Sequence, residues 1–114
     1  MRVFAALSLV MFGLSAGVTA VAVETWTDVA LVDTMCVRKV EKDPNAHTKE
    51  CAVGCAGSGY GVILADGTFL KLDKAGNEKA LAALKASDKK DRLRVTVTGD
   101  RAGDTIAVKT IELK

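Results

Sequence analysis

The stretch "GYGVILADGTFLKLD", residues 59–73, has the clearest structural pattern of this chain. It places two short apolar runs on either side of Asp66 and Gly67. An Asp-Gly pair between apolar runs favours a type I′ turn, because its two positive φ angles match the twist of paired strands. The stretch therefore predicts a β-hairpin that turns at Asp66 and Gly67.

The segment after this hairpin predicts a helix that packs on one side. Residues 76–87 read "GNEKALAALKAS", with Asn77 in position to cap the start of the helix. Apolar residues three or four apart form one narrow stripe on such a helix. The residues of this stripe are Ala80, Leu81, Ala83 and Leu84.

Two further strands are expected at the C-terminal end. Residues 92–100, "RLRVTVTGD", alternate strictly between polar and apolar, which is typical of a half-buried strand. In residues 105–114, "TIAVKTIELK", the apolar residues change parity after Val108. This one-residue shift predicts a β-bulge near Lys109 and Thr110.

The segment before the hairpin begins with a strand and continues as a long loop. Residues 24–33, "ETWTDVALVD", are rich in β-branched and apolar residues and predict the first strand. Residues 34–59 show no strand pattern, yet they hold the only proline and every cysteine. In their second half, "KECAVGCA" predicts a short helix that is capped by Asn45 or Thr48 and ends before Gly57 and Gly59.

The order of these elements is strand, long loop, hairpin, helix, strand, strand. Five strands with a helix between the third and the fourth resemble the OB-fold, a small Greek-key β-barrel. The sequence therefore predicts a mostly β protein, an OB-fold-like barrel with a short helix in the loop between strands 1 and 2. The alternative is an open five-stranded α+β sheet.

The N-terminal residues have the layout of a secretory signal peptide. A basic start at Arg2 is followed by an apolar run and by the small-residue sequence Ala20-Val21-Ala22. We expect residues 1–22 to be cleaved and residues 23–114 to form a single OB-like domain. That domain would be periplasmic or secreted, with no stable membrane association after cleavage. The alternative is an uncleaved membrane anchor.

The charge balance gives no reason to expect a nucleic-acid partner. The chain has 16 basic and 14 acidic residues, whereas nucleic-acid binding depends on an excess of Lys and Arg. Its few aromatic residues also make no stacking platform for single strands. The main partner that we expect is a metal ion, held by the cysteine and histidine residues of the long loop. The alternative partner is a protein or small ligand on the barrel face.

The expected metal site comes from the sequence "HTKECAVGC", residues 47–55. His47, Cys51 and Cys55 are four residues apart, so a regular helix would place them in one slowly turning stripe. With Cys36 from the start of the loop, they make a Cys3His set, which is known for tetrahedral zinc. Thiolates also favour copper, to which Met35 would add a thioether. We therefore expect Cys36, His47, Cys51 and Cys55 to hold Zn²⁺ or a copper ion.

The same cysteines allow a second interpretation. In an oxidising compartment Cys36 would form a disulfide with Cys51 or Cys55 and leave one thiol unpaired. Such a bridge would stabilise the loop by about 3 kcal/mol. A bridge between Cys51 and Cys55 within one helix has poor geometry. A third interpretation, a thiol oxidoreductase, is weakened by the missing C-x-x-C pair.

Other catalytic chemistry has little support in the sequence, so we expect no enzyme. Asp28, Asp33 and Asp43 form no pair that the sequence brings together for general acid and base work. No G-x-S-x-G motif accompanies the single histidine. Asp33 is expected to cap the end of its strand, with an outer-shell contact to His47 as the alternative.

The linear pattern "VDTMC…HTKECAVGCAGSGYGVILADGTFLKLD…GDTIAVKTIEL" resembles small exported bacterial proteins that have no assigned role. The resemblance implies that the Cys/His segment accompanies the barrel-like tail, and it supplies no catalytic residues. We therefore expect an exported metal-binding protein with a structural or metal-handling role. The alternative is a disulfide-stapled binding module without a metal.

Overall fold

The structure is a computed structural model that describes residues 23–114, so the predicted signal peptide, residues 1–22, lies outside the described residues. The strands are β1 (Glu24–Asp33), β2 (Tyr60–Ile63), β3 (Phe69–Leu72), β4 (Arg94–Ala102) and β5 (Thr105–Leu113). The helices are α1 (Val37–Val40), α2 (Lys49–Gly54) and α3 (Lys74–Ala86), with 3-10 turns η1 (Pro44–Ala46) and η2 (Ala56–Ser58).

The strands close into a barrel in the order β1-β2-β3-β5-β4. β3 and β5 are parallel, whereas every other neighbouring pair is antiparallel. Together with α3 between β3 and β4, this order confirms the predicted OB-fold-like barrel. The alternative of an open α+β sheet is wrong, because β1 pairs with β4 as well as with β2.

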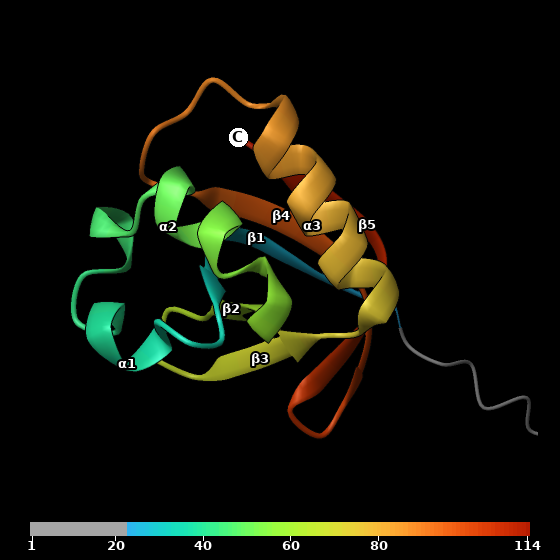
Figure 1. Cartoon of the computed structure of the whole chain (residues 1–114). Coiled ribbons are helices and arrows are strands. Elements are labelled where there is room, and N and C mark those ends of the chain that lie inside the picture. The colour runs from blue at the N-terminus through green and yellow to red at the C-terminus, as the bar shows by residue number, and fades with distance from the viewer. Residues whose placement is uncertain (1–22) are drawn as a thin grey trace, which may run out of the picture.

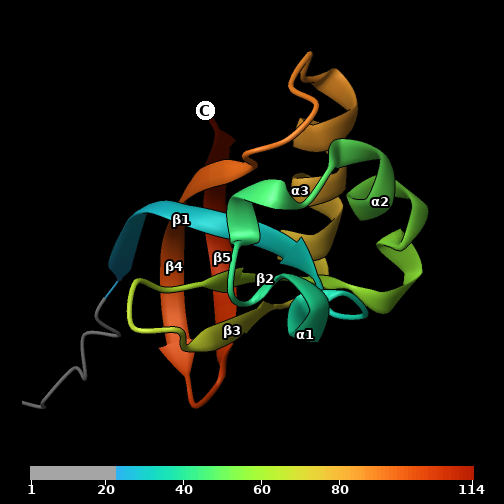
Figure 2. The same cartoon turned by 90° about the vertical axis from the view of Figure 1, so that its left-hand side faces the viewer.

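Two groups of helices cover the barrel. In Figure 1, α1 and α2 lie at the left of the barrel, whereas α3 lies at the upper right against β5. Figure 2 shows the barrel from the side on which the long loop between β1 and β2 lies. Ala52 of α2 and Leu84 of α3 both reach the barrel core, so the loop and α3 extend one hydrophobic interior.

The buried residues confirm the polar and apolar alternation that predicted a strand over residues 92–100. Leu93, Val95 and Val97 are buried, and each such side chain contributes about 1.5 to 3 kcal/mol to the free energy of folding. From Val29 onward β1 is buried on both faces. Its outer face joins a second cluster with α1, formed by Ala30, Val32 and Ile63 with Val37, Val40 and Phe69. The long loop therefore covers a strand face that would otherwise meet water.

The β2–β3 hairpin forms as predicted, but its turn type is different. The Gly67 N–H donates to the Leu64 carbonyl at 2.9 Å, and the Leu64 N–H donates to the Thr68 carbonyl at 2.8 Å. Gly67 has a positive φ of 88°, whereas Asp66 does not have a positive φ. The type I′ prediction is therefore wrong, because this is a three-residue loop that ends in a glycine bulge.

Helix α3 begins earlier than the sequence suggested. Asp73 is the N-cap, and its Oδ1 accepts the Gly76 N–H at 2.9 Å. The prediction of Asn77 as the cap is wrong, because its Oδ1 accepts the Tyr60 N–H at 2.8 Å instead. Asn77 thus joins α3 to the start of β2. The fully buried residues of α3 are Gly76, Ala80 and Leu84.

The predicted β-bulge in β5 is confirmed. Thr98 pairs with Thr110, but its neighbour Gly99 pairs with Val108. Lys109 is therefore the extra residue of β5, at the position where the apolar parity changes.

The long loop contains the predicted helix, α2, and three short elements that the sequence did not indicate, α1, η1 and η2. Of the two predicted caps, Thr48 is the one used, because its Oγ1 accepts the Cys51 N–H at 3.2 Å, whereas Asn45 lies in η1. The Lys49 N–H donates to the Lys90 carbonyl at 2.8 Å, which ties the loop to the connection between α3 and β4. None of the helices within residues 23–114 has the length and apolar character needed to cross a membrane.

Candidate metal centre

Three side chains that could hold a metal ion meet where the long loop leaves and rejoins the barrel. They are Asp33 at the end of β1, Cys36 just before α1, and Cys55 just after α2. One carboxylate oxygen and the two sulfur atoms all lie within 4.8 Å of one another. Asp33 is fully buried, whereas Cys36 and Cys55 are partly exposed.

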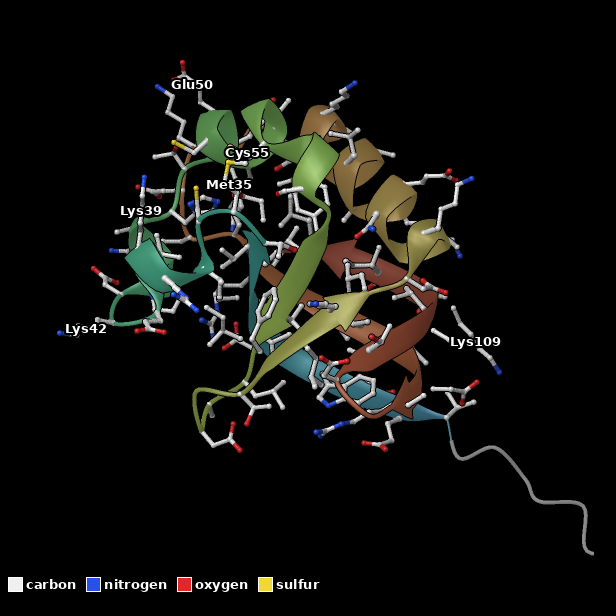
Figure 3. All side chains as sticks on the ribbon, turned by 60° about the horizontal axis from the view of Figure 1, so that its bottom comes forward. Met35, Lys39, Lys42, Glu50, Cys55 and Lys109 are labelled. Carbon is white, nitrogen blue, oxygen red and sulfur yellow. The ribbon has the colours of Figure 1, made fainter. Side chains whose placement is uncertain are left out.

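The pairing of β1 with β2 brings these residues together. Asp33 pairs with Tyr60, and the ladder extends by one bond because the Thr34 N–H donates to the Gly59 carbonyl at 2.9 Å. The turn after β1 therefore lies beside the turn before β2. Figure 3 labels Met35 and Cys55 on these two turns.

Local hydrogen bonds hold Cys36 against Asp33. The Cys36 N–H lies 3.1 Å from Asp33 Oδ2 and 3.1 Å from the Asp33 carbonyl. Asp33 thus caps the turn at its strand end, as the sequence suggested. The consequence for the site is that the carboxylate is directed toward the start of α1, where the Cys36 thiol lies.

Cys55 is positioned by the end of α2. Its N–H donates to the Cys51 carbonyl at 3.0 Å, and its own carbonyl accepts the Ser58 hydroxyl at 2.8 Å. Helix α2 is in turn fixed to the core, because the buried Tyr60 hydroxyl donates to the Ala52 carbonyl at 2.7 Å. The position of the Cys55 thiol therefore depends on the contact between Tyr60 and α2.

His47 contacts the carboxylate of the group instead of joining a stripe with the thiols. It precedes α2, so the four-residue spacing to Cys51 does not place the two on one helix face. Its imidazole is buried, and Nε2 lies 2.6 Å from Asp33 Oδ1. The sequence analysis gave Asp33 an outer-shell contact to His47 as its alternative role. The structure brings the two side chains together, but it groups Asp33, and not His47, with the thiols.

The contact between His47 and Asp33 is close but is not a well-formed hydrogen bond. Their separation is that of an ion pair, yet neither Nε2 nor Oδ1 has a hydrogen bond of acceptable angle within residues 23–114. Asp33 Oδ1 is thus a buried oxygen with a lone pair left for another partner.

Cys51 is separate from this group. It is exposed near the start of α2, and all three cysteines of the chain are free thiols in the structure. Of the two disulfide partners that the sequence offered to Cys36, the structure brings Cys55 close and does not include Cys51 in the group.

The environment of Cys36 favours its neutral form. Partial burial, the Asp33 carboxylate and the nearby Cys55 thiol together raise the pKa of Cys36 to about 11. Burial is the largest cause, followed by the hydrogen bond with Asp33. The pKa of Tyr60 is also raised, first by burial and then by the same two neighbours. A metal that binds Cys36 near neutral pH must therefore displace a proton from its thiol.

The sequence analysis did not include Asp33 among the candidate metal ligands. Asp33 is only three residues before Cys36, but a carboxylate at a strand end is more often a cap. The signal that would have identified it is topological. In an antiparallel β1–β2 pair, the end of β1 faces the start of β2, so Asp33 must lie near the residues just before Tyr60.

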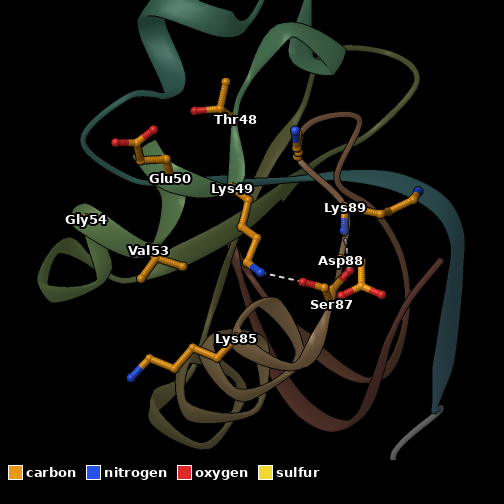
Figure 4. Close-up of a pocket in the computed structure, with 10 residues that line it drawn as sticks. Thr48, Lys49, Glu50, Val53, Gly54, Lys85, Ser87, Asp88 and Lys89 are labelled. Atoms are coloured by element: carbon orange, nitrogen blue, oxygen red, sulfur yellow. Dashed lines mark hydrogen bonds between the residues drawn. The ribbon is translucent and has the colours of Figure 1, made fainter.

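A surface groove lies away from the thiols. Figure 4 shows this groove between α2 and the connection from α3 to β4, with a volume of about 1040 Å³. The Lys49 ammonium crosses it to donate to the Ser87 carbonyl. None of Asp33, Cys36 and Cys55 lines the groove, so the candidate centre is a site at the junction of two turns and not a pocket.

We compared the chain with known proteins once this geometry was established. No protein-family model, no curated protein and no solved structure gave a significant match. The function is therefore argued from the group formed by Asp33, Cys36 and Cys55, and from its chemistry.

Proposed function

We propose that this protein binds Zn²⁺ through Asp33, Cys36 and Cys55, and that it holds or carries the ion without catalysing a reaction. The main support is that two thiols and one carboxylate, from the turn after β1 and the turn after α2, lie within 4.8 Å of one another. Such groups are the common ligands of zinc in proteins.

The spacing of the donor atoms fits a single ion. Zinc binds thiolate sulfur at about 2.3 Å, so two sulfurs on one tetrahedral ion lie about 3.8 Å apart. The sulfurs of Cys36 and Cys55 lie within 4.8 Å of each other, so at most a small adjustment brings both to one ion. The buried Asp33 carboxylate has an oxygen without a well-formed hydrogen bond, so it has acceptor capacity left for a cation.

The outer contact of Asp33 also suits a metal ligand. Carboxylates and imidazoles that bind metals are usually oriented by a partner outside the first set of ligands. His47 has this relation to Asp33, since its Nε2 lies 2.6 Å from Oδ1. His47 thus acts in this proposal as a positioning residue and not as a direct ligand.

The donor set favours zinc over copper. Cu(I) is a soft ion that prefers thiolate and thioether ligands, whereas a carboxylate is a hard donor that zinc accepts readily. Met35 is 70% exposed and is available as a thioether, so Cu(I) is the competing ion.

A metal-handling role follows from the number of ligands. Structural zinc sites usually have four protein ligands, whereas three leave one position open for exchange. The two thiols are partly exposed, so an ion or an acceptor can reach them from solvent. The barrel core is formed by other residues, so the fold does not depend on the ion.

We place this binding outside the cytoplasm because residues 1–22 have the layout of a signal peptide. N-terminal sequencing of the protein from a periplasmic fraction tests this part. A sequence that begins at Val23 is expected, whereas full-length protein recovered with the cytoplasmic fraction would contradict export.

Metal binding is tested by titrating the reduced, purified protein with Zn²⁺ and measuring stoichiometry by native mass spectrometry and calorimetry. One ion per chain is expected. Cys36→Ser and Cys55→Ser should abolish tight binding. Cys51→Ser is the matched control and should bind as the parent does, because Cys51 is exposed and outside the group. A reduced parent protein that takes up no zinc would overturn the proposal and favour a disulfide-stapled module.

The choice of metal is tested with Asp33→Asn. This change removes the hard donor, so the affinity for Zn²⁺ should fall. The loss should exceed the roughly 10-fold to 100-fold that is typical when only a partner outside the first set of ligands is removed. The affinity for Cu(I), measured against a chromophoric chelator, should change little. Equal losses for both ions would count against zinc as the preferred metal.

A further inference from the structure

Cys36 and Cys55 are the only two thiols that the described chain brings into one metal-binding group. We propose that they also form a redox switch, in which a Cys36–Cys55 disulfide and the bound metal exclude each other. This inference rests on the proposed zinc site and adds its regulation: oxidation of the two sulfurs releases the ion.

The geometry allows the bond. A disulfide needs its sulfurs about 2.05 Å apart, and the two thiols already lie within 4.8 Å. Cys36 precedes the four-residue α1, and Cys55 lies between α2 and η2. Both residues are therefore in turns where a side-chain rotation or a small backbone shift closes the remaining gap.

Cys51 does not compete well for either sulfur. A bond to Cys55 would join residues one helical turn apart, for which the Cβ separation in a disulfide is too short. A bond to Cys36 would displace the neighbour that is already in contact. The structure thus selects Cys36 and Cys55 as the pair that oxidises.

The oxidant that the step requires is a low-molecular-weight disulfide such as oxidised glutathione, written RSSR. One protein thiolate attacks a sulfur of RSSR, forms a mixed disulfide and releases the first RS⁻. The second protein thiolate attacks the protein sulfur of that mixed disulfide and releases the second RS⁻. Cys36 and Cys55 lose two electrons, RSSR gains two, and the two thiol protons leave with the two RS⁻ groups as RSH.

The metal is not oxidised in this scheme, because Zn²⁺ has no accessible redox chemistry. It leaves because two of its three protein ligands have become a disulfide, and a disulfide is a poor ligand compared with thiolates. Asp33 alone remains, with one carboxylate for the ion. In the reverse direction, bound zinc occupies both thiolates and slows their attack on RSSR.

The experiment equilibrates the purified protein with buffers of reduced and oxidised glutathione, with and without Zn²⁺. Intact mass reports the loss of two hydrogens, and mapping of tryptic peptides identifies the bridge. Cys51 and Cys55 share one tryptic peptide, so the mapping is repeated in Cys51→Ser and in Cys55→Ser.

The expected result is an intramolecular disulfide in the parent protein and in Cys51→Ser, and only mixed disulfides with glutathione in Cys55→Ser. Oxidation should lower the affinity for Zn²⁺ by more than about 100-fold. A smaller loss is typical when only a partner outside the first set of ligands is removed. Saturating Zn²⁺ should slow disulfide formation, and reduction should restore zinc binding.

Each contrary outcome has a separate meaning. If no Cys36–Cys55 bridge forms at any ratio while the reduced protein binds zinc, the switch is overturned and the metal site stands. If the bridge forms and zinc affinity is unchanged, the exclusion is overturned. If the bridge forms but the reduced protein binds no zinc, the proposed function itself fails.

Discussion

The imidazole of His47 lies against the carboxylate of Asp33, with Nε2 2.6 Å from Oδ1 and both side chains buried. The contact joins the middle of the long loop to the end of β1. The position of the long loop and the orientation of the Asp33 carboxylate therefore depend on each other. The Cys36 and Cys55 thiols lie beside this carboxylate. A buried charge in such a place is costly unless it has a partner.

Replacing His47 by Ala should destabilise the metal-free protein by about 3 kcal/mol, because it leaves the buried Asp33 carboxylate without its nearest partner. Urea denaturation measures the change. The double variant with Asp33→Asn should recover part of the loss, since an amide carries no charge. A loss below about 1 kcal/mol for His47→Ala would show that the contact has little energetic weight.

Replacing Tyr60 by Phe should cost about 1.5 kcal/mol, because the Ala52 carbonyl loses the hydrogen bond that it accepts at 2.7 Å. The ring itself stays packed, so the barrel should remain folded. Amide hydrogen exchange in α2 should become faster, since Tyr60 joins this helix to the core. Unchanged exchange in α2 would contradict this role of the hydroxyl.

Two glycines in helices should respond in opposite directions to alanine. Gly54 in α2 has free space for a Cβ, so Gly54→Ala should stabilise the protein by about 0.5 to 1 kcal/mol. Gly76 in α3 would place its Cβ 2.5 Å from Val108 Cγ2 and 3.0 Å from Leu72 Cβ. Overpacking there should outweigh the helix gain and cost about 1 to 3 kcal/mol. Thermal denaturation of both variants checks the signs, and two shifts of the same sign would refute the packing argument.

The thiol of Cys36 should alkylate slowly in the metal-free protein. Its raised pKa of about 11 means that the thiolate, which is the reactive form, stays scarce at neutral pH and increases until the pH passes that value. The rate of iodoacetamide modification should rise about tenfold per pH unit from pH 8 to pH 10. Peptide mass spectrometry measures it, with glutathione in the same tube as the reference.

The Asp33→Asn variant is the internal control for this titration. The negative charge of Asp33 disfavours the Cys36 thiolate, so its removal should lower the pKa of Cys36 and shift the alkylation profile to lower pH. If Cys36 of the parent protein reacts as fast as glutathione at pH 8, its burial beside Asp33 does not control its chemistry.

Local patterns predicted most of the barrel correctly. The alternation of Leu93, Val95 and Val97 predicted the buried face of β4, and the parity change after Val108 located the bulge at Lys109. Both patterns depend only on residues that are neighbours in one strand, so they can be read from the sequence.

The local predictions that were wrong concern positions where the sequence is compatible with more than one structure. An Asp-Gly pair suits a two-residue turn, but it also suits a three-residue loop with Gly67 as the bulge. Asn77 is a good cap by residue type, but Asp73 lies closer to the strand end and caps α3 instead. In each case the length of the connection to the neighbouring strand selected the outcome.

Hydrophobic period is a property of residues close together in the chain, so it was enough to predict the strands, α3 and the bulge. Which donors meet depends instead on how the strands pair. Antiparallel pairing of Asp33 with Tyr60 brings the two turns together and selects Asp33, Cys36 and Cys55, while His47 contacts the carboxylate and Cys51 is left in solvent. The contact between these two turns arises from the pairing of β1 with β2, about which the local spacing of the cysteines carries no information.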